Sequence, residues 1–451
     1  MMNEPHIGID ERATYRPSLA RMSWTLTSHP LSLTPVGLDR PPAALAASPS
    51  NFSVFNAGLL PTDDRLLLFF RVSNMHFCAG EPPRTSWLDS IRLETHIRSY
   101  LAVAEVDAFS FELRAAGSVL HDAVSLFRTE GEACSYHFGA EAGLRGTFSG
   151  LEDPRPFWSP SSGAVPRSPW LLASAWSDDC ARLRMHLIKL PPLGSSHDDE
   201  SPWTRASQLP LLVDAWPANT EAWLKSPMAH PESEPIQKNW LPFVHKGELL
   251  IEYRLEPHVV LHVDSTSGRC VPLSCEPSAA QLTAVGPSSH RAQLACLIRP
   301  GIAFPSFEPL WNVEAEYGRV SGGAPPIHLP AYNVYLGLAH VKESRSMPHH
   351  IGTDRMVYHH FFYAFDDAPP FSIIAKGSLR WLPEPPQQAA EEAKAAASNR
   401  SNAAPTVQFA SGMVLNSAGD ELTISYSVLD CGVRLTRVPL AEVLSDIALI
   451  W

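Results

Sequence analysis

Two adjacent carboxylates and an arginine lie in the hexapeptide Gly150-Leu151-Glu152-Asp153-Pro154-Arg155, directly before an apolar segment. A carboxyl group that donates a proton near neutral pH needs a partly desolvated niche, and a nearby arginine opposes this unless it is aimed at a bound anion. If the chain is an enzyme, we expect Asp153 to be its proton donor. The alternative is an acidic turn in which Arg155 pairs with Glu152, because Pro154 disfavours a helical conformation at Asp153.

The elements that must position this hexapeptide are short strands. The apolar runs 52–60 and 65–71 flank a Pro/Asp turn and predict a β-hairpin. The same plan recurs in five groups of runs: 52–60, 65–71 and 99–106; 152–158, 170–176 and 184–190; 238–243, 249–253 and 259–263; 332–340 and 358–365; 408–413, 421–427 and 433–435. Such spacing suggests radial repetition, since each small sheet can bury its faces only against its neighbours. We therefore predict an all-β fold, a five-bladed β-propeller with long inter-strand insertions.

The predicted propeller spans residues 50–451 as one catalytic domain. Residues 1–49 form an N-terminal extension that is rich in proline and polar residues, and residues 21–26 are a candidate strand that closes a sheet. Residues 191–235 and 383–405 are expected to be loop insertions, the second of them either an exposed helix or disordered.

Composition limits the partners. The formal net charge of −12 and the absence of a basic run argue against nucleic acid or an anionic membrane. The polar N-terminus and the lack of a long apolar run indicate a soluble, cytoplasmic protein. Seven scattered cysteines without a C-x-x-C pair are expected to be reduced thiols, and they give no zinc signature.

In a propeller, polar groups at the starts of successive blades meet at one axial pocket. The residues that would converge there are Asn56 and Arg71 from the first group, Glu152, Asp153 and Arg155 from the second, Lys238, Asn239 and His258 from the third, and Tyr426 and Asp430 from the fifth. Acids, cations, a histidine and amide or hydroxyl donors together suit an anion beside a polyhydroxylated ligand.

Five motifs in this order resemble a known family. They are Phe55-Asn56-Ala57-Gly58 with Leu67-Leu68-Phe69-Phe70-Arg71, then Glu152-Asp153-Pro154-Arg155, Lys238-Asn239-Trp240, Leu255-Glu256-Pro257-His258, and Ser411-Gly412 with Ile424-Ser425-Tyr426-Ser427-Val428-Leu429-Asp430. The chain resembles the β-mannoside phosphorylases of glycoside hydrolase family 130 and the related β-1,2-mannosyltransferase/phosphorylases of glycosyltransferase family 108. The resemblance covers roughly residues 50–445.

The resemblance implies a five-bladed propeller that catalyses inverting transfer of a mannosyl group between a sugar acceptor and phosphate. It implies that Asp153 is the general acid, acting through a sugar hydroxyl, and that Arg155, Lys238 and His258 hold phosphate. Asn56, Arg71, Asn239, Tyr426 and Asp430 would bind the sugar, and Glu152 would support its neighbours. No cofactor is implied, because inorganic phosphate or a sugar phosphate is a co-substrate. Phosphate is already an anionic nucleophile, so no second catalytic carboxylate is needed.

Two positions depart from the family pattern. Ser427 stands where the family often has glycine, and Ser321-Gly322-Gly323-Ala324-Pro325 only loosely matches a glycine-rich loop of such proteins. These departures, with the insertions, bear on the sugar substrates more than on the catalytic centre.

Each candidate also has a structural alternative. Arg71 is equally compatible with a strand-end ion pair, Lys238 with a solvated strand start, and His258 with a structural hydrogen bond. Tyr426 and Asp430 are compatible with a capped turn. The adjacent pairs His349-His350 and His359-His360 point to opposite faces of a strand, so no metal site is predicted.

Two alternative functions remain open at this point. One is an inverting glycoside hydrolase on the same propeller, which would need further carboxylates near Asp153. The other is a non-catalytic propeller that binds glycans. This third class could bind proteins in place of glycans. A carbohydrate substrate is the expected partner of the favoured enzyme, and the sequence leaves the oligomeric state open.

Overall fold

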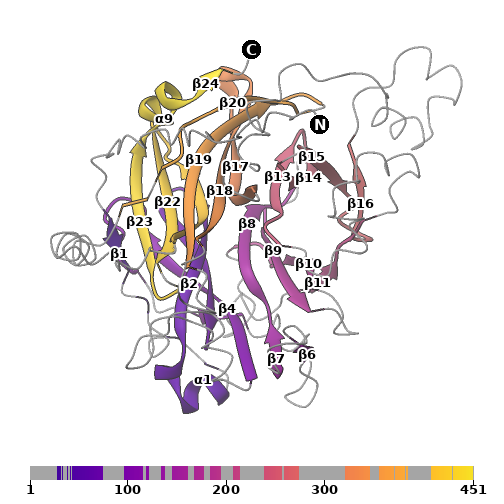
Figure 1. The fold of residues 1–451 in the computed structure, drawn as a ribbon, viewed down its shortest axis with the longest axis vertical. Coiled ribbons are helices and arrows are strands. Elements are labelled where there is room, and N and C mark those ends of the chain that lie inside the picture. The colour runs from indigo at the N-terminus through magenta and orange to yellow at the C-terminus, as the bar shows by residue number, and fades with distance from the viewer. Residues whose placement is uncertain are drawn as a thin grey trace, which may run out of the picture.

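The computed structural model of the chain shows five β-sheets arranged in a ring (Figure 1). It describes residues 28–31, 33, 38, 41, 43–74, 96–114, 118–120, 134–137, 145–160, 167–176, 183–193, 207–213, 238–255, 258–273, 320–345, 355–369, 371–380, 382–383, 408–428 and 430–449. The predicted five-bladed β-propeller is confirmed by these sheets. We number the blades in chain order.

Each blade is a mainly antiparallel sheet, and the innermost strands of the five blades are β2, β8, β13, β17 and β21. Blade 1 contains β2 (Ser53–Pro61), β3 (Arg65–Ser73), β4 (His96–Asp107), β5 (Ser118–Val119), β6 (Cys134–His137) and β7 (Arg145–Gly150). Blade 2 contains β8 (Glu152–Trp158), β9 (Pro169–Trp176), β10 (Leu183–Lys189) and β11 (Ser207–Pro210), and blade 3 contains β12 (Leu212–Val213), β13 (Leu241–His245), β14 (Glu248–Arg254), β15 (Val259–Val263) and β16 (Arg269–Pro272).

Blades 4 and 5 complete the ring and include contributions from both ends of the described chain. Blade 4 contains β17 (Val320–Leu329), β18 (Val334–Arg345), β19 (Arg355–Asp366), β20 (Ile373–Lys376) and β24 (Ala448–Leu449), and blade 5 contains β21 (Gln408–Leu415), β22 (Glu421–Val428), β23 (Val433–Pro439) and β1 (His29–Pro30). Among the described residues, the helices are α1 (Ala43–Ala47) and α9 (Leu440–Asp446), with single 3₁₀ turns at Pro49–Asn51 and Pro330–Tyr332.

The apolar core is divided among the five interfaces between neighbouring blades. Along β3, Leu66, Leu68 and Phe70 pack toward blade 5. The intervening Leu67 and Phe69 pack toward blade 2. The remaining three clusters lie between blades 2 and 3, 3 and 4, and 4 and 5. Because successive side chains alternate between the faces of a strand, a blade covered on both sides needs a continuous apolar run, and the run 66–70 has this pattern.

The ring is closed by pairing the two ends of the described chain. Strand β1 is antiparallel to β23, with His29 opposite Leu435. Figure 1 shows the indigo β1 beside the yellow β23. The predicted closing strand at residues 21–26 lies outside the described residues, whereas the strand that closes blade 5 comes a few residues later.

Two predictions about the elements are corrected. The insertion 191–235 is not loop throughout, because β11 and β12 lie within it and form the outer edges of blades 2 and 3. Of the insertion 383–405, only Pro383 lies within the described part.

Strand β17 was missed because its sequence, VSGGAPPIHL, has two glycines and two prolines.

Crowding near the axis explains the composition of β17. A Cβ atom on Gly322 would lie 2.6 Å from Leu241, and one on Gly323 would lie 2.8 Å from the Leu338 carbonyl oxygen. The inner edge of an innermost strand has no ladder partner, so proline is tolerated there. Glycine and proline therefore permit this strand to approach its neighbours, although they weaken its signal in the sequence.

Four of the five innermost strands share one irregularity. Register shifts interrupt β2 between Phe55 and Gly58 and β8 between Glu152 and Arg155. Further shifts follow Gly322 in β17 and Ala410 in β21. In each case the innermost strand of a blade bulges, and a bulge re-aims the side chains at that point.

Candidate functional site

Asp153 lies at the bulge of β8 in a left-handed backbone conformation, with φ of 55°. The Asn56 side-chain amide, from the corresponding bulge of β2, donates to Asp153 Oδ1 at 2.8 Å. Arg71 Nη1 lies 3.5 Å from the same oxygen, and the Asp153 side chain keeps 14% of its surface exposed. Blades 1 and 2 thus hold one carboxylate at an accessible position.

Left-handed backbone recurs beside this carboxylate. Asn56 has a φ of 51° and Asn239, two residues before β13, has a φ of 63°. Asparagine and aspartate tolerate this region better than other non-glycine residues do. Asn56, Asp153 and Asn239 therefore share a left-handed backbone conformation, and each belongs to one of the first three blades. A pattern of apolar residues in the sequence does not reveal this conformation.

Arg71 is almost fully buried and connects the two carboxylates of the hexapeptide. Its Nη2 donates to Glu152 Oε1 at 3.1 Å, its Nε donates to Ser99 Oγ at 3.0 Å, and its guanidinium lies over the Phe55 ring. Glu152 also accepts from Lys238 Nζ at 2.8 Å. Glu152 therefore pairs with Arg71 and Lys238 rather than with Arg155.

The charges around Asp153 set its protonation. Burial opposes ionisation of Asp153, but Lys238, Arg71 and Arg155 together outweigh it and lower its pKa to about 2. Burial likewise opposes the charge on Lys238, yet Glu152 and Asp153 raise its pKa above the ordinary value. In the free protein Asp153 is therefore an anion held among cations.

Asp430 is a second carboxyl group at this site, in the turn between β22 and β23. Burial, assisted by Asp153 and Glu152 and opposed by Arg71 and Lys238, raises the pKa of Asp430 to about 6. Asp430 is thus brought together with Asp153, as predicted from the sequence, although it is far away along the chain.

Arg155 follows Asp153 by two residues in β8 and is 1% exposed. Its Nη1 reaches the carbonyl oxygens of Asp153 and Pro154 at 3.4 and 3.5 Å, and its guanidinium lies over the Phe409 ring at 5.2 Å. Its Nε and Nη2 have no partner among the described residues. Burial, opposed by Asp153, lowers the pKa of Arg155 to about 10, so the side chain stays charged at neutral pH.

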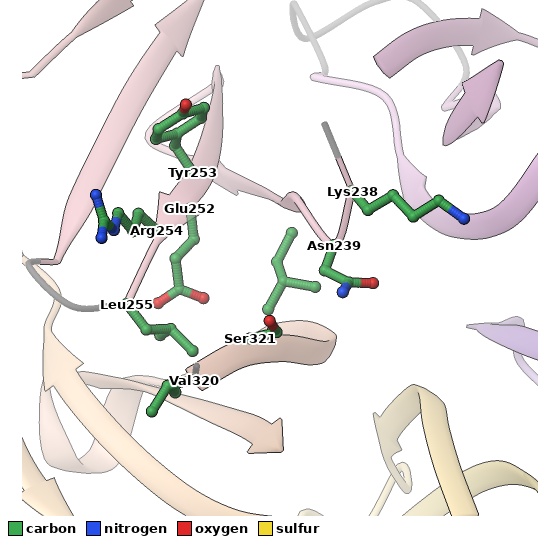
Figure 2. Close-up of a pocket in the computed structure, with 10 residues that line it drawn as sticks. Lys238, Asn239, Glu252, Tyr253, Arg254, Leu255, Val320 and Ser321 are labelled. Atoms are coloured by element: carbon green, nitrogen blue, oxygen red, sulfur yellow. The ribbon is translucent and has the colours of Figure 1, made fainter. Parts of the chain in front are cut away.

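A pocket adjoins Lys238 and Asn239 between blades 3 and 4 (Figure 2). Its wall also includes Glu252, Ser321 and Gly322. Figure 2 shows the Lys238 side chain directed away from Glu252. This is consistent with the ion pair between Lys238 and Glu152 of blade 2.

His258 is engaged within blades 3 and 4. Its Nε2 lies 2.6 Å from Glu252 Oε1, and its Nδ1 lies 2.7 Å from the Phe371 carbonyl oxygen. Glu252 also accepts a hydrogen bond from the Tyr363 hydroxyl. Both ring nitrogens of His258 are therefore occupied, and its described contacts do not include Arg155 or Lys238. The structural hydrogen bond that the sequence left as an alternative is present.

The structure does not bring Tyr426 to this site. The side chain is fully buried in the core between blades 4 and 5. Its hydroxyl donates to the Pro383 carbonyl oxygen at 2.8 Å and lies 2.8 Å from Ser28 Oγ. The neighbouring Ser427, at the position where the family pattern often has glycine, accepts a hydrogen bond from the Asn56 backbone amide. Blade 5 therefore supports Asn56 through Ser427.

Sequence reasoning missed Ser99, Glu252 and Tyr358. Ser99 and Glu252 lie inside strands 99–106 and 249–253, where a polar residue facing a buried neighbour is not visible in the pattern. Tyr358 precedes the pair His359-His360, which drew attention only as a possible metal site. Burial raises the pKa of Tyr358, and Asp430 and Asp153 raise it further.

Three other findings concern the described residues. No group of three or more His, Cys, Asp or Glu side chains there is arranged to hold a metal ion. No helix in this part is long and apolar enough to cross a membrane. Cys431 is disulfide-bonded, so the expectation that every cysteine is reduced is wrong, whereas Cys270 is a buried free thiol. The pair His349-His350 lies outside the described residues.

No family model matches the chain, and no curated protein matches it significantly. Among solved structures, it is similar to β-1,2-mannobiose phosphorylase from Listeria innocua in complex with β-1,2-mannobiose. The identity is 15%, the match covers 93% of this chain and 99% of that chain, and the TM-score is 0.47. A putative glycosidase from Bacteroides thetaiotaomicron gives 13% identity, 85% and 86% coverage and a TM-score of 0.45.

The structural neighbours also include a member of the GH130 family of mannoside phosphorylases, from a study of glycoside hydrolases that target β-1,2 mannosidic linkages in Candida mannan. This match has 13% identity, covers 86% of this chain and 84% of that chain, and has a TM-score of 0.43. At such low identities no site residue is carried over from these structures.

Proposed function

We propose that the protein is a carbohydrate-active enzyme that catalyses inverting glycosyl transfer between phosphate, or a sugar phosphate, and a β-mannoside or oligosaccharide acceptor. The observation that carries the proposal is the setting of Asp153. This carboxylate lies on a bulge of an innermost strand, is held by Asn56, and is surrounded by Arg71, Arg155 and Lys238. These five residues come from motifs of the first three blades, which are far apart in the sequence.

The proposed roles follow from these contacts. Asp153 supplies the proton, and Lys238 and Arg155 provide the positive charge for phosphate. Asn56, Arg71, Asn239 and Asp430 surround the sugar. His258 and Tyr426 have no direct part in this proposal, because their polar atoms are hydrogen-bonded elsewhere.

In the proposed reaction a phosphate oxygen attacks the anomeric carbon of the mannosyl group, on the face opposite the glycosidic oxygen. The new carbon–oxygen bond forms as the glycosidic bond breaks, which inverts a β-mannoside to α-mannose 1-phosphate. The electron pair goes to the leaving oxygen, which takes a proton that Asp153 delivers through a sugar hydroxyl. Phosphate is already anionic, so the attack needs no general base.

The low pKa of Asp153 in the free protein is compatible with this role. A group with a pKa of about 2 carries no proton at neutral pH. Phosphate bound at Lys238 and Arg155 would cancel much of the positive charge that lowers this pKa. Anion binding would thereby raise the pKa of Asp153 toward the range in which a carboxyl group can act as an acid.

Hydrolysis is the second candidate, and Asp430 is the observation that favours it. An inverting hydrolase needs a base for water, and Asp430 is a carboxyl group near Asp153 with a pKa of about 6. The two reactions differ in their products, since phosphorolysis gives mannose 1-phosphate and hydrolysis gives mannose.

The deciding experiment incubates the protein with β-1,2-mannobiose and other short β-mannosides, with and without phosphate, and identifies the products by NMR. We expect phosphate-dependent formation of α-mannose 1-phosphate. In the reverse direction, mannose 1-phosphate with mannose should release phosphate. Mannose as the product regardless of phosphate would establish hydrolysis instead.

Variants test the role of Asp153. Asp153→Asn should lower turnover by at least about 100-fold, since general acid catalysis contributes on that order. Asp63→Asn is the matched control, because Asp63 is exposed in the β2–β3 turn. Full activity of Asp153→Asn, or no turnover by the native chain with any mannosyl donor, would refute the proposal.

A further inference from the structure

Blade 4 supplies the Tyr358 side chain to the site, and Tyr358 is not part of any of the five sequence motifs. Tyr358 lies near the beginning of β19, paired with Lys342 of β18, and is half-buried. The other blade 4 strands contribute Ser321 and Gly322 to the pocket beside Lys238. Tyr358 therefore lies in blade 4, which packs between blades 3 and 5.

Ring packing places Tyr358 and Arg155 against the same phenylalanine. The Tyr358 ring meets the edge of Phe409 at a centroid distance of 6.3 Å and lies 5.3 Å from the ring of His340. The same Phe409 ring carries the Arg155 guanidinium at 5.2 Å. Tyr358 and Arg155 thus contact one phenylalanine, and Arg155 in turn contacts the Asp153 backbone.

The Tyr358 hydroxyl differs from those of three buried tyrosines, Tyr335, Tyr363 and Tyr426. Tyr335 donates to the Val244 carbonyl oxygen, Tyr363 to Glu252, and Tyr426 to the Pro383 carbonyl oxygen. The Tyr358 hydroxyl makes no hydrogen bond to the described residues, although a half-buried tyrosine normally finds a partner. Its donor is thus available to a ligand.

The charges near Tyr358 identify the ligand chemistry. Burial, then Asp430, then Asp153 raise the pKa of the phenol, so the hydroxyl keeps its proton. A carboxylate can only accept hydrogen bonds, whereas a sugar hydroxyl both donates and accepts. A sugar hydroxyl that donates to Asp430 or Asp153 would therefore have an acceptor lone pair for a neighbouring O–H.

We propose that Tyr358 is a further substrate-contacting residue, whose hydroxyl donates to a sugar oxygen held by Asp153 or Asp430. This inference rests on the proposed function, since it takes the ligand to be a sugar. It assigns blade 4 a direct part in sugar binding, beside the residues of blades 1, 2, 3 and 5.

The test compares Tyr358→Phe with Tyr335→Phe, its matched control. Both variants lose only a phenolic oxygen from blade 4, but the Tyr335 hydroxyl bonds to Val244 of the protein itself. Binding of mannose and of β-1,2-mannobiose is measured by calorimetry, and a thermal melt checks that each variant is folded. Tyr358→Phe should weaken binding roughly 5- to 50-fold, as expected for a lost donor in a partly desolvated site, and Tyr335→Phe should not.

The outcomes separate this inference from the function on which it rests. If the native chain binds and turns over the sugar but folded Tyr358→Phe binds it within about twofold of the native chain, only this inference is wrong. If the native chain binds neither sugar, both proposals are wrong. A selective loss in Tyr358→Phe supports the hydrogen bond, because packing alone would be preserved by phenylalanine.

Discussion

At the scale of single residues, the site contains two carboxyl groups that the protein shifts in opposite directions. Cations lower the pKa of Asp153 to about 2 despite its burial, whereas burial raises the pKa of Asp430 to about 6. Environments that separate the pKa values of neighbouring acids are typical of sites that handle protons. The same separation affects the stability of the fold.

The raised pKa of Asp430 predicts how stability depends on pH. Between about pH 4 and pH 6 the folded chain binds a proton at Asp430 that the unfolded chain has released, so the free energy of unfolding falls as pH rises through this window. Asp430→Asn should remove this dependence. At pH 7 the variant should be more stable by on the order of 1 to 3 kcal/mol, and near pH 3 it should match the native chain.

Urea unfolding at several pH values would measure this effect. The control is Asp63→Asn, which alters an exposed carboxylate in a turn. An Asp430→Asn curve that runs parallel to the native curve from pH 3 to pH 7 would contradict the assignment.

At the scale of elements, the bulged inner strands determine where the side chains point. Gly58 follows the bulge of β2, and a Cβ atom there would lie 2.1 Å from Pro156 Cδ and 2.7 Å from the Pro154 carbonyl oxygen. Strands β2 and β8 therefore approach so closely that only glycine fits. This close approach brings Asn56 within hydrogen-bonding distance of Asp153.

Gly58→Ala should force the two strands apart. We expect a loss of about 2 kcal/mol or more in the free energy of unfolding, together with a large loss of activity, because the Asn56–Asp153 contact depends on the spacing. Gly432→Ala is the control, since a Cβ atom there would meet nothing within 4 Å, and it should change stability by less than about 1 kcal/mol. Chemical denaturation and turnover measure both variants, and equal stability of the two would refute the steric account.

The elements also show what the sequence could and could not predict. Strand 65–71 was predictable because both of its faces are buried, so its apolar run is continuous. Strand 421–427 was predictable because apolar and small polar residues alternate along it. The convergence of Asn56, Asp153, Lys238 and Asp430 followed from their places at blade starts and from the family resemblance. Strand β17 was not predicted, because its glycines do not look like a strand in the sequence. They are needed because the tertiary structure is crowded beside Leu241 and Leu338.

Side-chain partnerships were the least predictable feature. His258 is hydrogen-bonded to the Glu252 carboxylate, and the Tyr426 hydroxyl donates to the Pro383 carbonyl oxygen. Both partners come from other parts of the ring, so no local pattern indicates them. Tyr358 was hidden for the same reason, since its significance depends on Phe409 and on carboxylates from two other blades.

At the scale of the whole molecule, ring closure joins residues about four hundred positions apart. The Leu31 amide donates to the Val433 carbonyl oxygen at 3.0 Å, and Ser28 meets the Tyr426 and Arg434 side chains. Strand β1 thereby covers the outer edge of blade 5. Neighbouring strands β21 and β22 carry residues that support Asn56 and Ala57.

Removal of residues 1–31 should weaken this closure. We expect the midpoint of thermal unfolding to fall by about 3 to 8 °C, because the edge of β23 loses its partner and the Tyr426 hydroxyl loses Ser28. Ser28→Ala, which removes only the hydroxyl contacts, should cause a smaller fall. An unchanged midpoint in the truncated chain would show that β1 contributes nothing to closure.

Blade 5, which combines β1 with β21, β22 and β23, also has a consequence for the order of assembly during synthesis. Blades 1 to 3 can each form when their strands leave the ribosome, whereas blade 4 waits for β24 and β1 must wait for β23 to be made. Until then, the edge of β2 that packs against blade 5 has no neighbour, and Asn56 lacks its contact with Ser427. Translation that stops before residue 433 would therefore yield chains with an open ring, whose uncovered apolar faces make them targets for chaperones and proteases rather than partially active enzymes.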